Sequence, residues 1–189
     1  MSKIVIIGAG AMGSAFALPC LDNNHDINIV GTHLENDFID SLQKNNNFHP
    51  GLNTEIPKEI KILKFEKFDE LLKSNVDLIV LGISSKGIEW VADQLSRLYK
   101  DGKIPKLLML TKGLSIHKNQ YELLVDKLER LLGDRGIKKA DISAVGGPCL
   151  AAGLANRVHS SVVIANKDIE TAKKIADMLN TSYYHTSHS

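Results

Sequence analysis

The chain opens on a short apolar run that ends in three regularly spaced glycines. Residues 4–7 (IVII) have the length and composition of a buried strand, lead directly into Gly8-x-Gly10-x-x-Gly13, and are followed by a helical pattern. Gly8 permits a tight strand-to-helix turn, Gly10 lets the backbone approach a pyrophosphate, and Gly13 allows the helix to pack closely on the strand. The N–H groups and positive dipole end of the helix then face phosphate oxygens. The segment therefore predicts a dinucleotide site.

Strand-like and helical patterns alternate along the rest of the chain. The strand-like runs are rich in Ile, Val and Leu and mostly apolar on both faces, which is typical of strands covered by helices on both sides. This alternation predicts right-handed βαβ crossovers and an α/β fold of Rossmann type, with a doubly wound, mainly parallel sheet and helices on both faces. The expected strands are residues 3–7, 27–30, 60–63, 76–81, 106–110, 142–145 and 158–165, and the expected helices are 12–21, 36–44, 68–73, 87–99, 119–132 and 169–179, with a loop at 45–57.

Composition limits the class of protein. A length of 189 residues suits one domain, or one domain with a fragment of another. The net charge is +1 and no block of like charge occurs, which argues against a nucleic-acid partner; no apolar run approaches the roughly 18 residues of a membrane span. Cys20 and Cys149 lack the spacing of a metal site, and we assign no metal. The first residues lead straight into a strand and leave no room for a signal peptide, so we expect a cytoplasmic protein without membrane insertion.

Four further loops are expected beside the glycine loop. In open sheets of this type, ligands bind at the carboxyl ends of the strands, near the point where the strand order reverses. The loops that follow the expected strands are dense in Gly, Ser, Thr and Lys, which suits contacts with phosphate and ribose. They are residues 31–33, 82–86, 111–113 and 146–149.

The position that would contact the adenosine ribose leaves the cofactor undecided. NAD-binding domains usually place Asp or Glu at the end of the second strand, about 20 residues after the glycine loop. Here that position reads Gly31-Thr32-His33, the nearest acid is Glu35, and no Arg or Lys stands there to hold a 2′-phosphate. Thr32 and His33 are candidates to contact the ribose or a phosphate. The alternative for His33 is a solvated residue at the start of the following helix. The choice between NAD and NADP stays open.

Six segments occur in order along nearly all of the chain: GAGAMGSA at 8–15, VGT at 30–32, NNFHPGLNTEIP at 46–57, LGISSKGI at 81–88, LTKGL at 110–114 and GGPCLA at 146–151. Together they resemble the N-terminal, cofactor-binding domain of NAD(P)-dependent glycerol-3-phosphate dehydrogenases, particularly the archaeal forms. The resemblance implies reversible hydride transfer between NAD or NADP and C2 of sn-glycerol 3-phosphate, giving dihydroxyacetone phosphate, in the supply of phospholipid precursors. TKG and GP-x-x-A are more specific than the glycine motif.

The same resemblance implies roles for residues in the cofactor loops. The backbone N–H groups of Ala11 and Met12 would meet the pyrophosphate, and Met12 would line the nicotinamide side, with core packing as its alternative. Gly147, Cys149 and Ala151 match the GP-x-x-A loop that contacts the cofactor. Cys149 is either a reactive thiol at a helix N-terminus or a small filler of the nicotinamide pocket, and Pro148 is expected in the first turn of the following helix.

Ser84 and Ser85 follow the fourth expected strand. We expect them to line the adenosine side of the cofactor. Serine is also a common helix N-cap, so capping of the helix at 87–99 is the alternative for both residues.

Lys112 is the expected catalytic residue and a cofactor contact. It stands beside Gly113 at the carboxyl end of a buried strand, from which its ammonium can reach the cleft. There it would hydrogen-bond the substrate oxygen and counter the negative charge that develops during hydride transfer. An exposed loop lysine is the alternative. We do not assign the general base to Lys112, because the resemblance gives that proton to a lysine of the C-terminal domain.

Two departures from the family pattern set the expected domain organisation. Gly153 replaces the acid of GP-x-x-A-x-E, and the chain reaches residue 189 about where a helical substrate domain would begin. We therefore expect residues 1–189 to form the dinucleotide-binding domain alone, with the helical C-terminal domain absent and little or no turnover. The full-length protein would act on a small phosphorylated substrate, with a homodimer as its possible assembly.

Two other functions stay open. One is a related reductase of another small oxo-acid or sugar phosphate, such as a 2-dehydropantoate reductase or a 6-phosphogluconate dehydrogenase. These enzymes share the glycine loop but fit TKGL and GGPCLA less well. The other is a non-catalytic domain that senses a dinucleotide.

Overall fold

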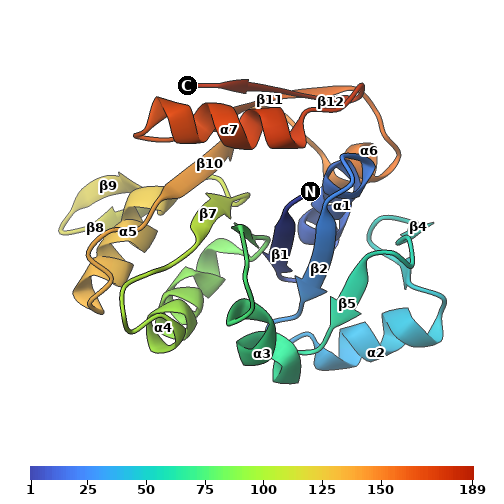
Figure 1. Cartoon of the computed structure of the whole chain (residues 1–189), viewed down its shortest axis with the longest axis horizontal. Coiled ribbons are helices and arrows are strands. Elements are labelled where there is room, and N and C mark those ends of the chain that lie inside the picture. The colour runs from blue at the N-terminus through green and yellow to red at the C-terminus, as the bar shows by residue number, and fades with distance from the viewer.

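An eight-stranded sheet forms the centre of the computed structural model, which describes residues 1–189 (Figure 1). The strands run through the whole chain, from the segment before the glycine loop to the last residues. They are β1 (Lys3–Ile7), β2 (Asp26–Val30), β5 (Lys61–Leu63), β6 (Leu78–Leu81), β7 (Lys106–Met109), β10 (Ile142–Gly146), β11 (Ser160–Ala165) and β12 (Tyr184–His188).

The strand order is β12-β11-β10-β7-β6-β1-β2-β5. Neighbouring strands are parallel except for β10 and β11. The chain moves outward from β1 through β2 to β5, and then returns to the other side of β1 at β6. The order therefore reverses between β1 and β6, and the expected Rossmann-type, mainly parallel sheet is confirmed.

Helices cover both faces of this sheet. The helices are α1 (Ala11–Asp22), α2 (Asn36–Lys44), α3 (Phe68–Leu72), α4 (Ile88–Leu98), α5 (Leu124–Asp134), α6 (Ala151–Ala155) and α7 (Ile169–Leu179), with 3-10 turns at Phe65–Lys67 and Ser85–Gly87.

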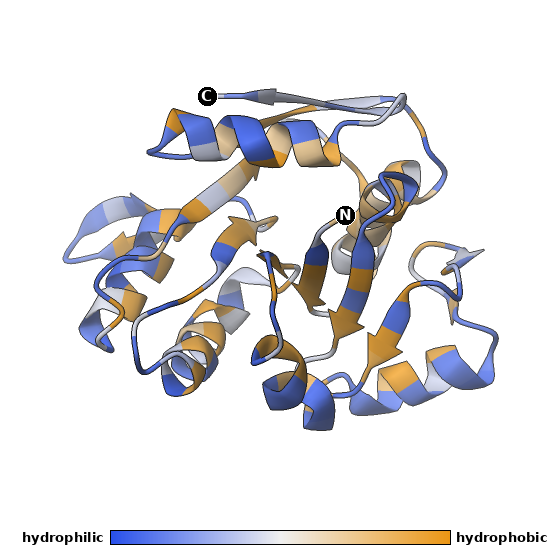
Figure 2. Ribbon diagram, in the orientation of Figure 1, coloured by the Kyte–Doolittle hydropathy of each residue, from blue (hydrophilic) through white to orange (hydrophobic).

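The core is divided by the sheet into two clusters. Alternation along β1 sends Ile4 and Ile6 into the cluster under α1, α6 and α7, and sends Val5 and Ile7 into the cluster under α3, α4 and α5. All four side chains are fully buried. Figure 2 shows the apolar strands at the centre and polar residues along the outer sides of the helices. Burial on both faces explains why the strands read as continuous apolar runs.

Most expected elements are confirmed within one or two residues, but the expected helix at 119–132 is wrong in its first part. Residues there form a hairpin of β8 (Leu114–His117) and β9 (Gln120–Leu123), and α5 begins only at Leu124. Lys118 and Asn119 form the two-residue turn with φ of 49° and 62°. Two positive φ angles match the tight hairpin turns whose twist suits the flanking strands.

Three smaller features also differ from expectation. The loop at 45–57 contains two short paired strands, β3 (Phe48–His49) and β4 (Thr54–Glu55). Residues at the chain end form β12, which pairs with β11 and was not predicted. Pro148 precedes α6, which begins at Ala151, so the expectation that Pro148 lies in the first helical turn is wrong.

Candidate functional site

The glycine loop is the turn between β1 and α1, and its three glycines have different surroundings. Gly8 has a φ of +107°, and a Cβ there would lie 2.7 Å from the carbonyl oxygen of Gly82. A Cβ on Gly13 would lie 2.3 Å from the carbonyl oxygen of Gly8. At Gly10, by contrast, the nearest atom is Glu35 Oε1 at 4.0 Å. Gly8 and Gly13 are thus required by packing, whereas Gly10 leaves open space in front of the helix.

The start of α1 offers backbone donors to this open space. No protein acceptor is found for the N–H groups of Gly10, Ala11 and Met12, and no acidic residue lies in the first helical turn. These are the donors that an α-helix leaves unpaired, at the positive end of its dipole. A phosphate group suits such a position. The residues present therefore fit the pyrophosphate of a dinucleotide.

The peptide groups of Ala9 are held from several sides. The Ala9 N–H donates to Glu35 Oε1 at 3.0 Å, and the Ala9 carbonyl accepts from Ser14 Oγ at 3.1 Å. His49 Nε2 lies 3.2 Å from the same carbonyl. Since a carbonyl oxygen only accepts, Nε2 carries the hydrogen and donates. Glu35 and His49 thereby connect two distant loops to the glycine loop.

His49 is a site residue that the sequence did not reveal. Its side chain is buried, and Nδ1 has no hydrogen-bond partner. Burial lowers the pKa of the His49 imidazole, which agrees with a neutral ring that donates from Nε2. The contact joins residues 40 positions apart, so no local pattern signals it.

The loops after β6, β7 and β10 are also linked to one another. The Thr111 hydroxyl donates to the carbonyl oxygen of Ile83, and Lys112 Nζ donates to the carbonyl oxygen of Gly147. The structure therefore brings Lys112 and the GP-x-x-A loop together. The Lys112 side chain is exposed, so its ammonium is accessible from solvent at the carboxyl ends of the strands.

The GP-x-x-A loop follows β10 and packs on the core cluster under α1. Gly147 has a φ of +104°, and a Cβ there would lie 3.1 Å from the carbonyl oxygen of Ser161. Cys149 and Ala151 are half-buried against the core cluster under α1, and Ala11 and Met12 pack against the same cluster. Residues of both cofactor loops thus pack on the same core cluster, and Met12 makes the core contact that was its alternative role.

The residues expected on the adenosine side flank β1. The Thr32 N–H donates to Glu35 Oε2 at 2.7 Å. The His33 side chain is exposed, and its ring lies against Trp90 and Phe65, with ring centroids 5.2 and 6.2 Å away. These contacts place an aromatic group next to the loop after β2. The expected contact of His33 with the cofactor stays a prediction.

Ser84 and Ser85 lie exposed after β6. Neither side chain caps a helix, because a 3-10 turn intervenes, Gly87 is the N-cap of α4, and no side-chain cap bond forms at either helix start. The alternative role for these serines, N-capping, is therefore wrong. Their expected contact with the cofactor stays a prediction.

A cavity of substantial size lies elsewhere in the molecule. It has a volume of about 850 Å³ and is lined by Ile142, the first residue of β10, and by Ala165, the last residue of the antiparallel β11. It is thus at the opposite end of the sheet from the glycine loop, and none of the expected site residues lines it.

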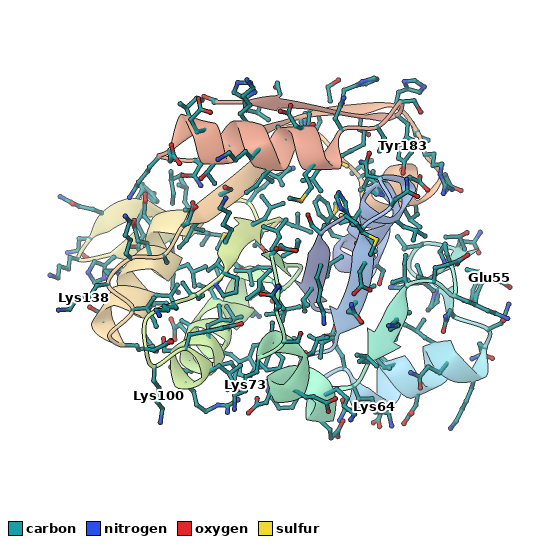
Figure 3. All side chains as sticks on the ribbon, in the orientation of Figure 1. Glu55, Lys64, Lys73, Lys100, Lys138 and Tyr183 are labelled. Atoms are coloured by element: carbon teal, nitrogen blue, oxygen red, sulfur yellow. The ribbon has the colours of Figure 1, made fainter.

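No group of three or more His, Cys, Asp or Glu side chains is placed to hold a metal ion. None of the helices combines the length and apolar character that crossing a bilayer requires. Figure 3 shows the labelled Lys73, Lys100 and Lys138 at the periphery, pointing outward from the ribbon.

Comparison with known families and curated proteins gives consistent results. A family model described as the NAD-dependent glycerol-3-phosphate dehydrogenase N-terminus matches residues 3–172. The chain is 28% identical over 181 residues to an NADP(+)-dependent glycerol-3-phosphate dehydrogenase of Archaeoglobus fulgidus. The aligned region covers 96% of this chain and 51% of that protein. A glycerol-3-phosphate dehydrogenase of Streptococcus agalactiae, named for NAD(P)+, is 26% identical over 184 residues, with the same two coverages. The chain thus spans about half the length of these relatives.

Solved structures show the same fold. Glycerol-3-phosphate dehydrogenase from Coxiella burnetii superposes with a TM-score of 0.79 at 20% identity, over 100% of this chain and 54% of that one. The enzyme from Plasmodium falciparum gives a TM-score of 0.78 at 20% identity, over 100% and 52%.

Proposed function

The chain belongs to the NAD-dependent glycerol-3-phosphate dehydrogenase family by its match to the N-terminal domain, and we propose that residues 1–189 bind NAD or NADP as the cofactor half of such an enzyme. The glycine loop supports this proposal most directly. Its free N–H groups at the start of α1 and the open space at Gly10 suit a pyrophosphate. The sheet reverses its strand order beside the same loop, where ligands of this fold bind.

For the whole protein, we propose the interconversion of sn-glycerol 3-phosphate and dihydroxyacetone phosphate. The nicotinamide, when bound, accepts a hydride from C2 of the substrate or returns it. In this proposal, Ala11 and Met12 hold the pyrophosphate through their N–H groups, and Gly147, Cys149 and Ala151 border the cofactor. A small phosphorylated substrate and a phospholipid precursor as product belong to this proposal, and the homodimer and the cytoplasmic location stay predictions.

Lys112 is the residue that we assign to catalysis. Its ammonium is exposed at the carboxyl end of β7 and already donates to a carbonyl oxygen, that of Gly147. The same group can donate to the substrate oxygen at C2 and stabilise the negative charge that develops there as the hydride leaves. We assign proton transfer from that oxygen to the part of the full-length enzyme that corresponds to the half of the relatives not spanned by this chain.

A fluorescence titration of the chain with NADH and, separately, with NADPH tests the proposal. We expect saturable binding of at least one dinucleotide and little oxidation of it when dihydroxyacetone phosphate is added. Absence of binding of both dinucleotides to a folded sample would contradict the proposed function. Substrate-dependent oxidation at the rate of a complete dehydrogenase would contradict the assignment of this chain as the cofactor half.

Gly10→Ala is the matched variant for this titration. The backbone at Gly10 has a φ of −67°, which alanine adopts, and the space beside it is open. The free energy of unfolding should therefore change by less than about 1 kcal/mol. The added methyl group occupies the approach of the pyrophosphate, so dinucleotide affinity should fall by about tenfold or more. Unchanged affinity would place the dinucleotide away from this loop.

A further inference from the structure

Glu35 places a carboxylate between the glycine loop and the loop after β2. Oε1 accepts from the Ala9 N–H at 3.0 Å, and Oε2 accepts from the Thr32 N–H at 2.7 Å. Oε1 also lies 4.0 Å from the position of a Cβ on Gly10. Both carboxylate oxygens are thus oriented by backbone groups of the two loops, and the side chain is half-buried.

The charge of this carboxylate is not neutralised by a basic side chain. Glu35 takes part in none of the salt bridges of the chain. Lys64 pairs with Asp40, Lys67 pairs with Glu70, and the His33 ring packs on aromatic side chains. The negative charge of Glu35 therefore lies beside the glycine loop without a basic side chain as its ion-pair partner.

We infer that Glu35 is the residue that selects NAD over NADP, an inference that rests on the proposed function. In a Rossmann-type sheet, the adenosine ribose lies beside the end of the second strand and the glycine loop. A carboxylate has about four acceptor positions, of which two are used here, so it can still accept from a ribose 2′-hydroxyl. A 2′-phosphate offers no such donor and brings a like charge against Glu35.

The acid is displaced from its usual place in the sequence. β2 ends at Val30, and the carboxylate comes from Glu35, the residue before α2, which folds back to the glycine loop. The residue spacing does not place Glu35 at the ribose position, but its hydrogen bond to the Ala9 N–H brings the carboxylate to the glycine loop. The inferred preference differs from the cofactor in the name of the Archaeoglobus fulgidus relative, which is NADP+.

The test compares the dissociation constants of NADH and NADPH for three forms of the chain: wild type, Glu35→Gln and Asp37→Asn. Wild type should bind NADH at least about tenfold more tightly than NADPH, since repulsion by a nearby like charge easily reaches that size. Glu35→Gln removes the charge and should reduce this ratio by about tenfold, mainly through tighter NADPH binding. Asp37→Asn removes the same charge from an exposed position in the first turn of α2 and should leave the ratio unchanged.

Each outcome has a definite meaning. The wild-type comparison needs no variant to fold, and equal or tighter binding of NADPH would overturn the inference while leaving the proposed function in place. A ratio that Glu35→Gln does not change, or that Asp37→Asn changes as much, would overturn the role of Glu35. Failure of the folded wild type to bind either dinucleotide would overturn the proposed function and the inference with it.

Discussion

At the scale of single residues, the glycine loop separates two physical demands. Gly10 keeps space free for a ligand, whereas Gly8 and Gly13 are fixed by contacts within the protein. Replacing one glycine of the motif should therefore mainly weaken binding, whereas replacing either of the others should also destabilise the fold. Measurements of stability and of binding can distinguish these two effects.

Gly13→Ala should destabilise the fold as well as prevent binding. The new Cβ would lie 2.3 Å from the carbonyl oxygen of Gly8, and no side-chain rotation can relieve a contact with backbone. We expect urea denaturation to show a loss of about 3 kcal/mol or more in the free energy of unfolding. Gly133→Ala in α5 is the control, since no atom lies within 4 Å of its Cβ and alanine favours helix. Similar losses in both variants would refute the packing explanation.

His49 predicts a pH dependence of stability. Burial lowers its pKa below the ordinary value of 6.5, although the charge of Glu35 opposes the shift. Between the two pKa values the unfolded chain binds more protons, so the free energy of unfolding falls as the pH decreases through this range. Denaturation at about pH 7.5 and about pH 5.5 should show this fall in wild type and a smaller one in His49→Gln, whose amide can still donate to Ala9. Equal pH dependence in the two proteins would show that His49 is not responsible.

At the scale of elements, the sequence correctly predicted the helices and strands whose hydrophobic pattern is contained in consecutive residues. α2 and α7 have their expected bounds because each is amphipathic and is flanked by polar residues. The hairpin at 114–123 was missed because its turn is Lys118-Asn119, without the glycine that usually marks such turns. β12 was missed because it is a polar edge strand whose pairing with β11 is non-local.

The same distinction applies to the candidate site. The glycine loop is encoded in consecutive residues, and its position in the fold was predictable. Glu35 and His49 reach Ala9 across 26 and 40 positions, so their contacts with the loop depend on how the sheet and the loop at 45–57 fold. Only the nearest acid to the ribose position, Glu35, was visible in the sequence, and its orientation was not.

Asp22 connects three elements near the end of α1. Its carboxylate accepts from Arg157 at 2.9 and 3.0 Å and from the Tyr183 hydroxyl at 2.6 Å; Figure 3 labels Tyr183 at this edge of the molecule. Hydrogen bonds from Arg157 lower the pKa of Asp22 despite partial burial. A double-mutant cycle with Asp22→Ala and Arg157→Ala should give a coupling of about 0.5–1 kcal/mol, because the pair is partly exposed. Additive losses would indicate that the pair contributes nothing to holding α1 against the turn before β11.

At the scale of the whole molecule, one sheet separates and connects two cores. β1 contributes alternate side chains to both clusters, so neither cluster can lose its packing without affecting the strands of the other. The chain has one tryptophan, Trp90, which packs against the cluster under α4. Its fluorescence therefore reports on one face of the sheet, whereas far-UV circular dichroism reports on all elements.

Leu179→Ala tests whether the two faces unfold together. Leu179 is fully buried in the cluster under α7, on the opposite side of the sheet from Trp90. Its truncation should cost about 2–5 kcal/mol and shift the denaturation midpoints of fluorescence and circular dichroism by the same amount. Leu132→Ala, equally buried in the cluster against which Trp90 packs, is the matched control and should shift both probes in the same way. If Leu179→Ala moved only the circular dichroism transition, the cluster under α7 would unfold separately, and the two faces of the sheet would not form one cooperative unit.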